Sequence, residues 1–259
     1  MKLTYLPDRT AKPRQTGVSM VMDKSLSLRE AEDLIASAHH LIDFVKLGFG
    51  TSIVCNQVAE KVKIYQQAGI KVYVGGTLFE AFLVRNMFDD YRKYIDNLGL
   101  DTVEISDGSM IMDHDEKCEY IHKLTKNYTV LSEVGSKESG ILIAPNRWIE
   151  MMQKELQAGS FKVIAEARES GNVGIYRPTG KAHVSLINKI LTKVTVDKIL
   201  WEAPLKSQQV WFIKNFGSNV NLGNIPPSEI IPLETLRLGL RGDTFFQFLP
   251  PKFRKLQPK

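Results

Sequence analysis

The sequence predicts a single (β/α)8 barrel with parallel strands, and three observations lead to this fold class. Short apolar segments alternate with helix-like segments eight times, which is typical of a parallel sheet covered by helices. The chain has 259 residues, and a closed barrel of this kind takes about 250. Charged residues gather where the apolar segments end. An open doubly wound sheet would have fewer strands and a dinucleotide-binding loop after the first.

The eight expected strands are short and rich in Val, Ile and Leu. Buried parallel strands have this composition because helices cover their outer face. The only glycine-rich turn resembling a dinucleotide loop, Gly48-Phe49-Gly50, follows the second strand and has Ile53 where the third glycine belongs. The expected strands are Gly17–Asp23, Ile42–Leu47, Ile70–Val74, Thr102–Ser106, Tyr128–Glu133, a strand beginning at Lys162, Lys198–Glu202 and Asn219–Leu222.

The stretch KVIAEARESG at 162–171 shows most clearly how these strands end. It begins as a buried strand and changes abruptly to charged residues. On strand alternation Ile164, Glu166 and Arg168 share one face. Two charges at the end of a buried strand are costly unless they are paired, hydrated or holding a ligand. Because the loops after barrel strands share one face, residues at the strand ends are expected to form one site.

Composition bounds the class of protein and the expected domains. The chain is 43% hydrophobic and 24% charged, as in ordinary soluble proteins. The polar residues 1–16 are expected to form an arm, 17–248 the barrel and 249–259 a basic tail. The net charge of +5, from 34 basic and 29 acidic residues, favours anionic ligands. Without a basic run or an aromatic-interleaved patch, no nucleic-acid partner is expected.

The remaining signals concern location. No apolar run reaches the roughly 18 residues that a membrane helix needs, so no membrane partner is expected. The N-terminal segment lacks the apolar stretch of a signal peptide. Cys55 and Cys118 form no disulfide pattern, which fits a reducing, cytoplasmic location. Barrels commonly self-associate, so a homo-oligomer is possible.

Four of the strand-end residues are glutamates on neighbouring strands, and they predict a metal site. Carboxylates in one cavity repel one another unless a cation neutralises them, and oxygen ligands without Cys or His suit Mg²⁺. The alternative for any single glutamate is a structural ion pair, with Lys46 or Arg168 as its partner. The residues expected around the mouth are Glu104, Glu133, Glu166 and Glu202 as metal ligands, with Lys46, Arg168 and Asn221, and with Asp23 and Lys24 beside them.

Two groups of residues are candidates for binding phosphate. Barrels often bind phosphate through the loops after strands seven and eight and a helix N-terminus. In this chain those loops contain Lys206, Ser207 and Gln208, and then Gly223 and Asn224. The turn Gly75-Gly76-Thr77 after the third strand is a second candidate.

Distinctive segments follow the strand ends in order over nearly all of 17–246. They are Asp23-Lys24, FVKLGFGTS at 44–52, VYVGGTLFE at 72–80, VEISDGS at 103–109, LSEVG at 131–135, EARESG at 166–171, WEAPLKSQQ at 201–209, GSNVNLGNI at 217–225 and LETLRLGLRGDTF at 233–245. In these segments the chain resembles the phosphosulfolactate synthase family, the coenzyme M biosynthesis protein A type. A plant heat-stress-associated protein is also similar to this family.

The resemblance implies a barrel enzyme that uses Mg²⁺ to add sulfite to phosphoenolpyruvate, giving (2R)-2-O-phospho-3-sulfolactate. The product would enter coenzyme M biosynthesis or end as sulfolactate. Lys46 is the expected general acid, with Lys24 second, because lysine serves as an acid if surrounding cations lower its pKa. Arg168 is expected to grip sulfite or carboxylate, and Arg241 is a further candidate for the anion site. The alternatives are a non-enzymatic stress-protection homologue, or another phosphoenolpyruvate-using, enolase-like barrel.

Overall fold

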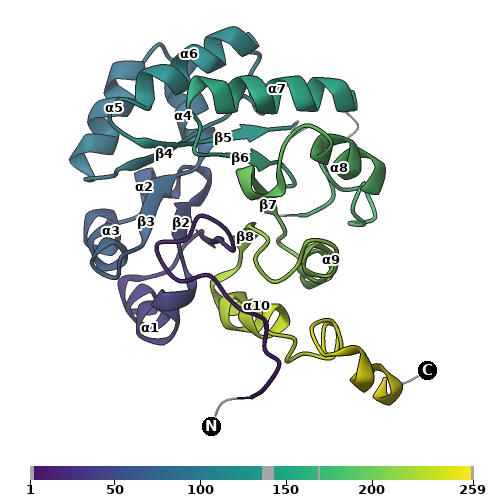
Figure 1. The fold of residues 1–259 in the computed structure, drawn as a ribbon. Coiled ribbons are helices and arrows are strands. Elements are labelled where there is room, and N and C mark those ends of the chain that lie inside the picture. The colour runs from purple at the N-terminus through teal and green to yellow at the C-terminus, as the bar shows by residue number, and fades with distance from the viewer. Residues whose placement is uncertain (1–2, 136–142, 169, 258–259) are drawn as a thin grey trace.

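Eight parallel strands stand at the centre of the structure, a computed structural model that describes residues 3–135, 143–168 and 170–257. The strands pair side by side in the order β3-β2-β1-β8-β7-β6-β5-β4. Helices surround them (Figure 1). The predicted (β/α)8 barrel is thus confirmed. The strands are β1 Ser19–Asp23, β2 Phe44–Leu47, β3 Lys71–Val74, β4 Thr102–Ile105, β5 Thr129–Val134, β6 Lys162–Ala165, β7 Ile199–Glu202 and β8 Leu222–Ile225.

The helices begin and end at residues suited to those positions. Ser27 and Glu30 cap the start of α1 reciprocally, each accepting the other's main-chain N–H. Gly159 ends α7 in a left-handed conformation. No described helix is long and apolar enough to cross a membrane. The helices are α1 Leu28–Ala38, α2 Thr51–Val54, α3 Val58–Gln67, α4 Gly76–Leu83, α5 Phe88–Asn97, α6 His114–Leu124, α7 Pro145–Ala158, α8 Val184–Leu191, α9 Lys206–Phe216 and α10 Ile230–Arg237.

Side chains close the barrel where β3 meets β4. Within the described residues no strand ladder joins these two strands, although they lie side by side. At their N-terminal ends, Lys71 Nζ lies 3.3 Å from Asp101 Oδ2 and donates to Thr129 Oγ1 at 3.0 Å. At their C-terminal ends, the Gly76 N–H donates to Glu104 Oε1 at 2.6 Å. Polar side chains therefore replace the missing ladder at both ends.

Strand alternation divides the core into two layers. The outward-facing residues, such as Val21 and Val45, pack against the helices in a large cluster. The inward-facing residues fill the inside of the barrel with a smaller apolar cluster. Because side chains alternate along a strand, the residue two positions after each inner residue also points inward, toward the mouth of the barrel. The inner residues are Val18, Met20, Phe44, Tyr73, Leu131, Ile164 and Leu200.

The eighth strand lies three residues later than predicted. The structure places β8 at Leu222–Ile225 instead of Asn219–Leu222. Asn221 therefore precedes the strand, at the end of the barrel opposite the mouth. Its buried side chain accepts the Val18 N–H at 3.1 Å and donates to the main-chain oxygens of Asp197 and Ile199, each at 3.0 Å. The predicted position of Asn221 at the mouth is wrong.

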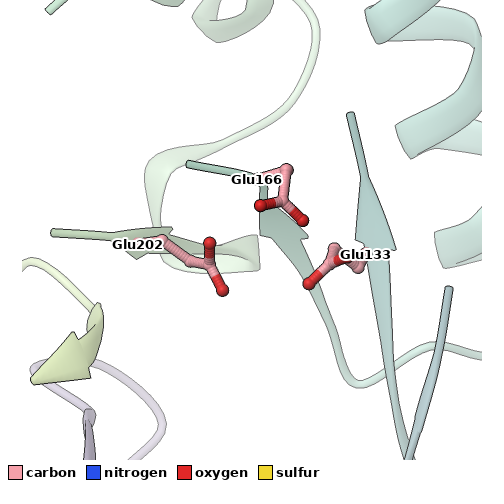
Figure 2. Close-up of side chains that lie close together, drawn as sticks. All are labelled: Glu133, Glu166 and Glu202. Atoms are coloured by element: carbon pink, nitrogen blue, oxygen red, sulfur yellow. The ribbon is translucent and has the colours of Figure 1, made fainter. Parts of the chain in front are cut away.

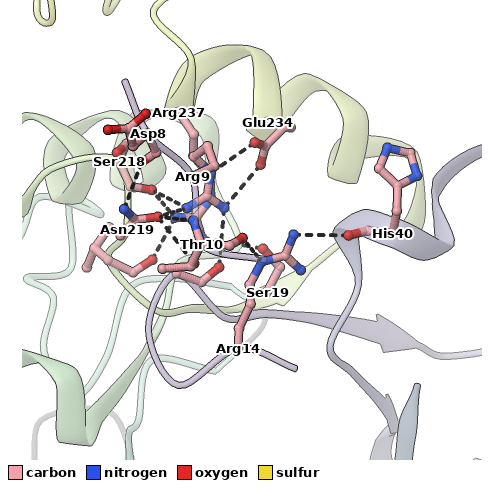
Figure 3. Close-up of polar contacts among 12 residues, drawn as sticks. Asp8, Arg9, Thr10, Arg14, Ser19, His40, Ser218, Asn219, Glu234 and Arg237 are labelled. Atoms are coloured by element: carbon pink, nitrogen blue, oxygen red, sulfur yellow. Dashed lines mark hydrogen bonds and ion pairs between the residues drawn. The ribbon is translucent and has the colours of Figure 1, made fainter. Parts of the chain in front are cut away.

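Arginine side chains close the N-terminal end of the barrel (Figure 3). The buried Arg237 donates to the main-chain oxygens of Ser218 and Val220, both at 2.7 Å. Arg9, in the expected N-terminal arm, pairs with Glu234 at 2.9 Å and donates to the Ser218 oxygen at 3.0 Å. Arg14 pairs with Asp43 at 3.1 Å. The arm therefore contributes its polar groups to the floor of the barrel.

We expect Arg9→Met to lower the free energy of unfolding by about 1–3 kcal/mol, because Glu234 and the Ser218 carbonyl lose a half-buried partner. Chemical denaturation measures this. Lys93→Met is the matched control, since Lys93 makes only an exposed ion pair with Asp90 on α5 and such pairs contribute little. Equal effects of the two substitutions would contradict the structural role of Arg9.

Lys162 also lies at this end, at the start of β6. Its ammonium donates to the main-chain oxygens of Gln15 at 2.7 Å and Asp197 at 2.6 Å. Burial lowers the pKa of Lys162 to about 8, although Asp197 opposes the shift. The unfolded chain keeps a lysine pKa of about 10.4 and so binds more protons between these two values. The contribution of Lys162 to stability is therefore complete above pH about 10.4, the pKa in the unfolded chain. It is lost as the pH falls through about 8, the pKa in the folded protein.

We expect the melting temperature of the wild-type protein, relative to that of Lys162→Met, to rise between pH 7 and pH 9.5. The comparison cancels the other titrating groups, which both proteins share. Differential scanning fluorimetry in matched buffers measures it. A difference that stays constant, or falls, across this range would show that Lys162 titrates normally.

Candidate active site

The glutamates of three neighbouring strands lie one layer above the apolar inside of the barrel. On β5, β6 and β7 the inward apolar residue is followed two positions later by a glutamate. Because side chains alternate along a strand, each glutamate points into the mouth. The pairs are Leu131 and Glu133, Ile164 and Glu166, and Leu200 and Glu202.

Glu133, Glu166 and Glu202 converge on one point (Figure 2). One carboxylate oxygen from each lies within 4.8 Å of the other two. Their exposed fractions are only 3%, 2% and 1%. Three buried oxygen ligands of this kind could hold a divalent metal ion such as Mg²⁺. Glu104, the fourth predicted ligand, lies outside this group and accepts the Gly76 N–H instead.

The loop after β6 orients two of these carboxylates with its main chain. The Ala167 N–H donates to Glu202 Oε2 at 2.9 Å, and the Arg168 N–H donates to Glu166 Oε1. Arg168 has a left-handed φ of 54°. Gly174 then approaches so closely that a Cβ would lie 1.9 Å from the Glu166 main-chain oxygen, so only glycine fits there.

Lys46 on β2 places its ammonium among the carboxylates. Its Nζ lies 2.9 Å from Glu104, 3.6 Å from Glu133 and 3.7 Å from Glu202. Burial alone would lower the pKa of Lys46, but these three carboxylates outweigh it and hold the pKa well above its ordinary value. The condition given above for a lysine acid, that surrounding cations lower its pKa, is therefore not met at Lys46 by the described residues.

Burial opposes the negative charge of the carboxylates around Lys46. It raises the pKa of Glu202 to about 7, with Lys46 opposing the shift and Glu133 adding to it. Burial likewise raises the pKa of Glu104. A carboxylate whose charged form is disfavoured by burial gains most from an additional cation. The donor set and the burial of the carboxylates therefore both fit a divalent metal ion.

A cavity of about 330 Å³ opens above these groups. This size suits a small ligand rather than a nucleotide. Two cations, Lys46 and Arg168, line the cavity beside the three carboxylates, so the cavity offers partners to an anionic group as well as to a cation. The lining residues are Met22, Lys46, Phe49, Gly75, Thr77, Ser109, Glu133, Glu166, Arg168, Glu202 and Asn224.

Sequence comparison identifies the family. Residues 7–243 match the family (2R)-phospho-3-sulfolactate synthase (ComA). The phosphosulfolactate synthase of Methanothermobacter thermautotrophicus is 42% identical over 244 residues, or 92% of this chain and 95% of the relative. That of Bacillus subtilis is 41% identical, over 93% of this chain and 97% of the relative.

The chain belongs to the (2R)-phospho-3-sulfolactate synthase family. It is therefore a member of an enzyme family. The Arabidopsis thaliana protein HEAT-STRESS-ASSOCIATED 32 is a more distant relative, 21% identical over 89% of this chain and 88% of its own.

Solved structures of other enzymes share only the barrel with this synthase-family member. The 3-hexulose-6-phosphate synthase of Salmonella typhimurium superimposes with a TM-score of 0.53 over 86% of this chain and all of its own, at 16% identity. The YdjI aldolase of Escherichia coli gives a TM-score of 0.54 over 83% of this chain and 76% of its own, at 10% identity.

Of the predicted phosphate-binding residues, Gly75 and Thr77 of the turn after β3 line the cavity, and so does Asn224. The β1–β8 register shifts by one residue beside it, as in a β-bulge. Asn224 has a left-handed φ of 55°, and its buried Oδ1 accepts no hydrogen bond from the described residues. A bulge that aims a buried, unsatisfied amide into a cavity indicates a ligand contact.

The other phosphate candidates are engaged elsewhere. Lys206, at the start of α9, pairs with Asp243 at 2.6 Å. The Gln208 amide donates to the main-chain oxygens of Gly171 and Gly180 and so fastens the loop after β6. The Gly76 N–H is taken by Glu104. Neither Ser207 nor Arg241, which follows α10, is among the residues that line the cavity.

Three predicted site residues remain, and they are Gly223 on β8, Asp23 at the end of β1 and Lys24 in the turn after β1. Gly223 faces the inside of the barrel, where a Cβ would lie 2.8 Å from Met20 Cε. Asp23 is fully engaged, with Lys61 and Tyr65 each 2.9 Å from its Oδ2. Asp23 also accepts the Leu26 N–H at 2.9 Å, which fixes the turn carrying the exposed Lys24.

Three wall residues were not predicted as site residues. Met22 ends the inward row of β1, and Phe49 and Ser109 lie in the turns after β2 and β4. The glycine-marked turns signalled these positions in the sequence. Glu80, buried on α4, had no such signal. It accepts the Ser109 N–H at 2.6 Å and the Ser106 hydroxyl.

We expect Glu166→Gln to weaken divalent metal binding by roughly tenfold or more, because it removes charge from the converging carboxylates. Glu104→Gln is the matched control, since Glu104 lies outside that group, and it should weaken binding far less. Electron paramagnetic resonance of added Mn²⁺ measures the free ion directly. If the two variants lost Mn²⁺ affinity equally, Glu104 would belong with the metal ligands after all.

Proposed function

We propose that this protein is a phosphosulfolactate synthase that adds sulfite to phosphoenolpyruvate, giving (2R)-2-O-phospho-3-sulfolactate. The observation that carries the proposal is the small cavity in which three buried carboxylates stand beside Lys46 and Arg168. The 41–43% identity to phosphosulfolactate synthases over most of the chain supports it. The similarity to the plant heat-stress protein is much weaker, at 21%, which favours the enzyme over the non-enzymatic alternative.

The reaction forms one bond between sulfur and carbon. The sulfur lone pair of sulfite attacks C3 of the enol phosphate, and the π electrons of C2=C3 pass to C2 and the adjoining carboxylate. A proton is then added to one face of C2, which sets the R configuration. The phosphate ester remains in place throughout, and no oxidant or reductant is needed.

The charges around the cavity suit this chemistry. Glu133, Glu166 and Glu202 would hold Mg²⁺, which when bound would supply positive charge opposite the negative charge that develops on the substrate carboxylate. Arg168 reaches the cavity from the other side and is placed to grip sulfite or the substrate carboxylate. Asn224 lines the cavity at the β8 bulge and is our candidate for binding the phosphate group, to which its side-chain N–H groups would donate.

Lys46 is our candidate for the proton donor at C2, because it is the ammonium that faces both the cavity and the carboxylates. Its ion pairs keep it protonated, as an acid must be before it donates. The same pairs oppose release of the proton, so the exposed Lys24 on the loop after β1 is the alternative donor.

We expect the purified protein to convert phosphoenolpyruvate into a new phosphate ester only when both sulfite and Mg²⁺ are present. ³¹P NMR follows the loss of the enol phosphate signal. Omission of sulfite and addition of a chelator are the controls. Conversion without sulfite would indicate another phosphoenolpyruvate-using barrel, and no conversion by folded protein would favour a non-enzymatic role.

We expect Lys46→Ala to lower turnover by about 10²–10⁴-fold, the usual contribution of a positioned acid. Lys93→Ala, which removes an exposed lysine on α5, should leave turnover unchanged. Circular dichroism checks that both variants are folded. Near-normal turnover in folded Lys46→Ala would transfer the acid role to Lys24, which Lys24→Ala then tests in the same assay.

A further inference from the structure

Behind the cavity, a buried lysine on α6 joins three parts of the barrel. Lys117 has an exposed fraction of 0%. Its Nζ lies 2.8 Å from Glu155 Oε1 on α7 and 2.9 Å from Asp107 Oδ1 in the loop after β4. It also donates to the main-chain oxygen of Glu133 at 2.6 Å, near the end of β5. All three protons of the ammonium thus have an oxygen partner from a different element.

The pairing keeps this lysine charged in a dry position. Burial alone would lower the pKa of Lys117, but Glu155 and Asp107 outweigh it and raise the pKa above its ordinary value. The neighbouring His114 offers Glu155 no second cation, because burial and Lys117 both lower its pKa. Glu155 is also fully buried. Lys117 and Glu155 therefore form a fully buried ion pair, and the partly exposed Asp107 is the second carboxylate on the same ammonium.

Stability is a poor explanation for such a pair. Taking two charges out of water costs about as much as their attraction returns, and apolar residues of similar volume often serve equally well. What the ammonium provides, and an apolar side chain does not, is a fixed geometry between its oxygen partners. Two of these partners, Asp107 and the Glu133 carbonyl, belong to segments that form the mouth of the barrel.

The segments held by Lys117 lead directly into the cavity. Glu133 places its carboxylate beside those of Glu166 and Glu202. Two residues after Asp107, Ser109 lines the cavity, and Glu80 on α4 holds the Ser109 N–H from the other side. The loop after β4 is therefore held from both sides, by Glu80 on α4 and by Lys117 on α6. Lys117 binds the end of β5 at the same time, through the Glu133 carbonyl.

We propose that Lys117 is a positioning residue: by binding the Glu133 carbonyl and Asp107 at once, it sets the Glu133 carboxylate in place for a divalent metal ion and sets the cavity wall at Ser109. The inference rests on the proposed function for the role of the metal. Lys117 touches neither substrate nor metal, and Glu155 serves to keep its ammonium charged and in place.

The test separates positioning from stability with a pair of variants. Lys117→Met leaves Glu155 buried without a partner and should lower the melting temperature by roughly 10 °C. Lys117→Met/Glu155→Leu removes both charges and should restore the melting temperature close to that of the wild type. The Glu133 carbonyl and Asp107 remain without their anchor in both variants. Lys154→Met is the control and should change nothing, because it removes exposed pairs, one with Asp115 between the same helices and one with Glu150 on α7.

Two readouts are taken on these variants. In the stable double variant we expect the affinity for Mn²⁺, measured by electron paramagnetic resonance, to fall about 10- to 100-fold, the usual effect of losing a group that orients a ligand. Turnover of phosphoenolpyruvate and sulfite should fall in parallel. A stable double variant with wild-type Mn²⁺ affinity and turnover would overturn the proposal, as would a wild-type protein that binds no Mn²⁺.

The two proposals fail in different ways. A wild-type protein that binds Mn²⁺ but does not consume sulfite contradicts the proposed reaction, whereas the fall in Mn²⁺ affinity would still establish the positioning role. If the double variant does not fold, Asp107→Ala takes its place, because it leaves the fully buried pair of Lys117 and Glu155 intact. We then expect a lower turnover at an unchanged melting temperature, and unchanged turnover would overturn the proposal.

Discussion

The structure depends on a concentration of buried negative charge at one level of the barrel. Inward-facing positions on β5, β6 and β7 change from apolar to glutamate within two residues, so the carboxylates stand directly on the apolar interior with little water beneath them. Burial opposes their ionisation, and the raised pKa of Glu202 is the measure of that opposition. Lys46 compensates part of this charge, and main-chain N–H groups hold the carboxylates in place.

Compensation comes from main-chain N–H groups as well as from cations. Gly76 donates to Glu104, Ala167 to Glu202 and Arg168 to Glu166. Each of these amides lies in the loop after a strand, where the chain turns toward the next helix. The loops therefore hold the carboxylates in fixed directions before any ligand arrives. A preorganised set of ligands loses little entropy when it binds a cation.

The sequence was sufficient to predict the strand ends but not the contacts between them. Alternation along a buried strand decides which side chains point inward, so Glu133, Glu166, Glu202 and Lys46 could be predicted to share the mouth. The position of β8 along the chain was predicted wrongly. Gly223 and Asn224 look like turn residues in the sequence, but they lie inside the strand, where the pairing with β1 has a bulge. That shift of three residues moved Asn221 to the opposite end and brought Asn224 to the cavity.

Contacts across the barrel escape sequence analysis for a physical reason. The pKa of Lys46 depends on whether its nearest neighbours are cations or anions, and those neighbours come from β4, β5 and β7. Alternation gives the direction of each side chain but not which of them meet. Lys117 is a stronger case, because helical spacing places it on the same face of α6 as Ile121 and Leu124 but does not show which oxygens its ammonium meets.

The two ends of the barrel differ in how they use charge, and this difference explains where function can reside. At the N-terminal end Arg237 and Lys162 donate to main-chain carbonyls, so each cation is satisfied by the chain itself. At the mouth the described carboxylates of Glu133, Glu166 and Glu202 instead converge on one point and line a cavity. Charged groups that the fold holds in place around a cavity are suited to binding a ligand, and the network around Lys117 extends that fixed geometry to α6 and α7.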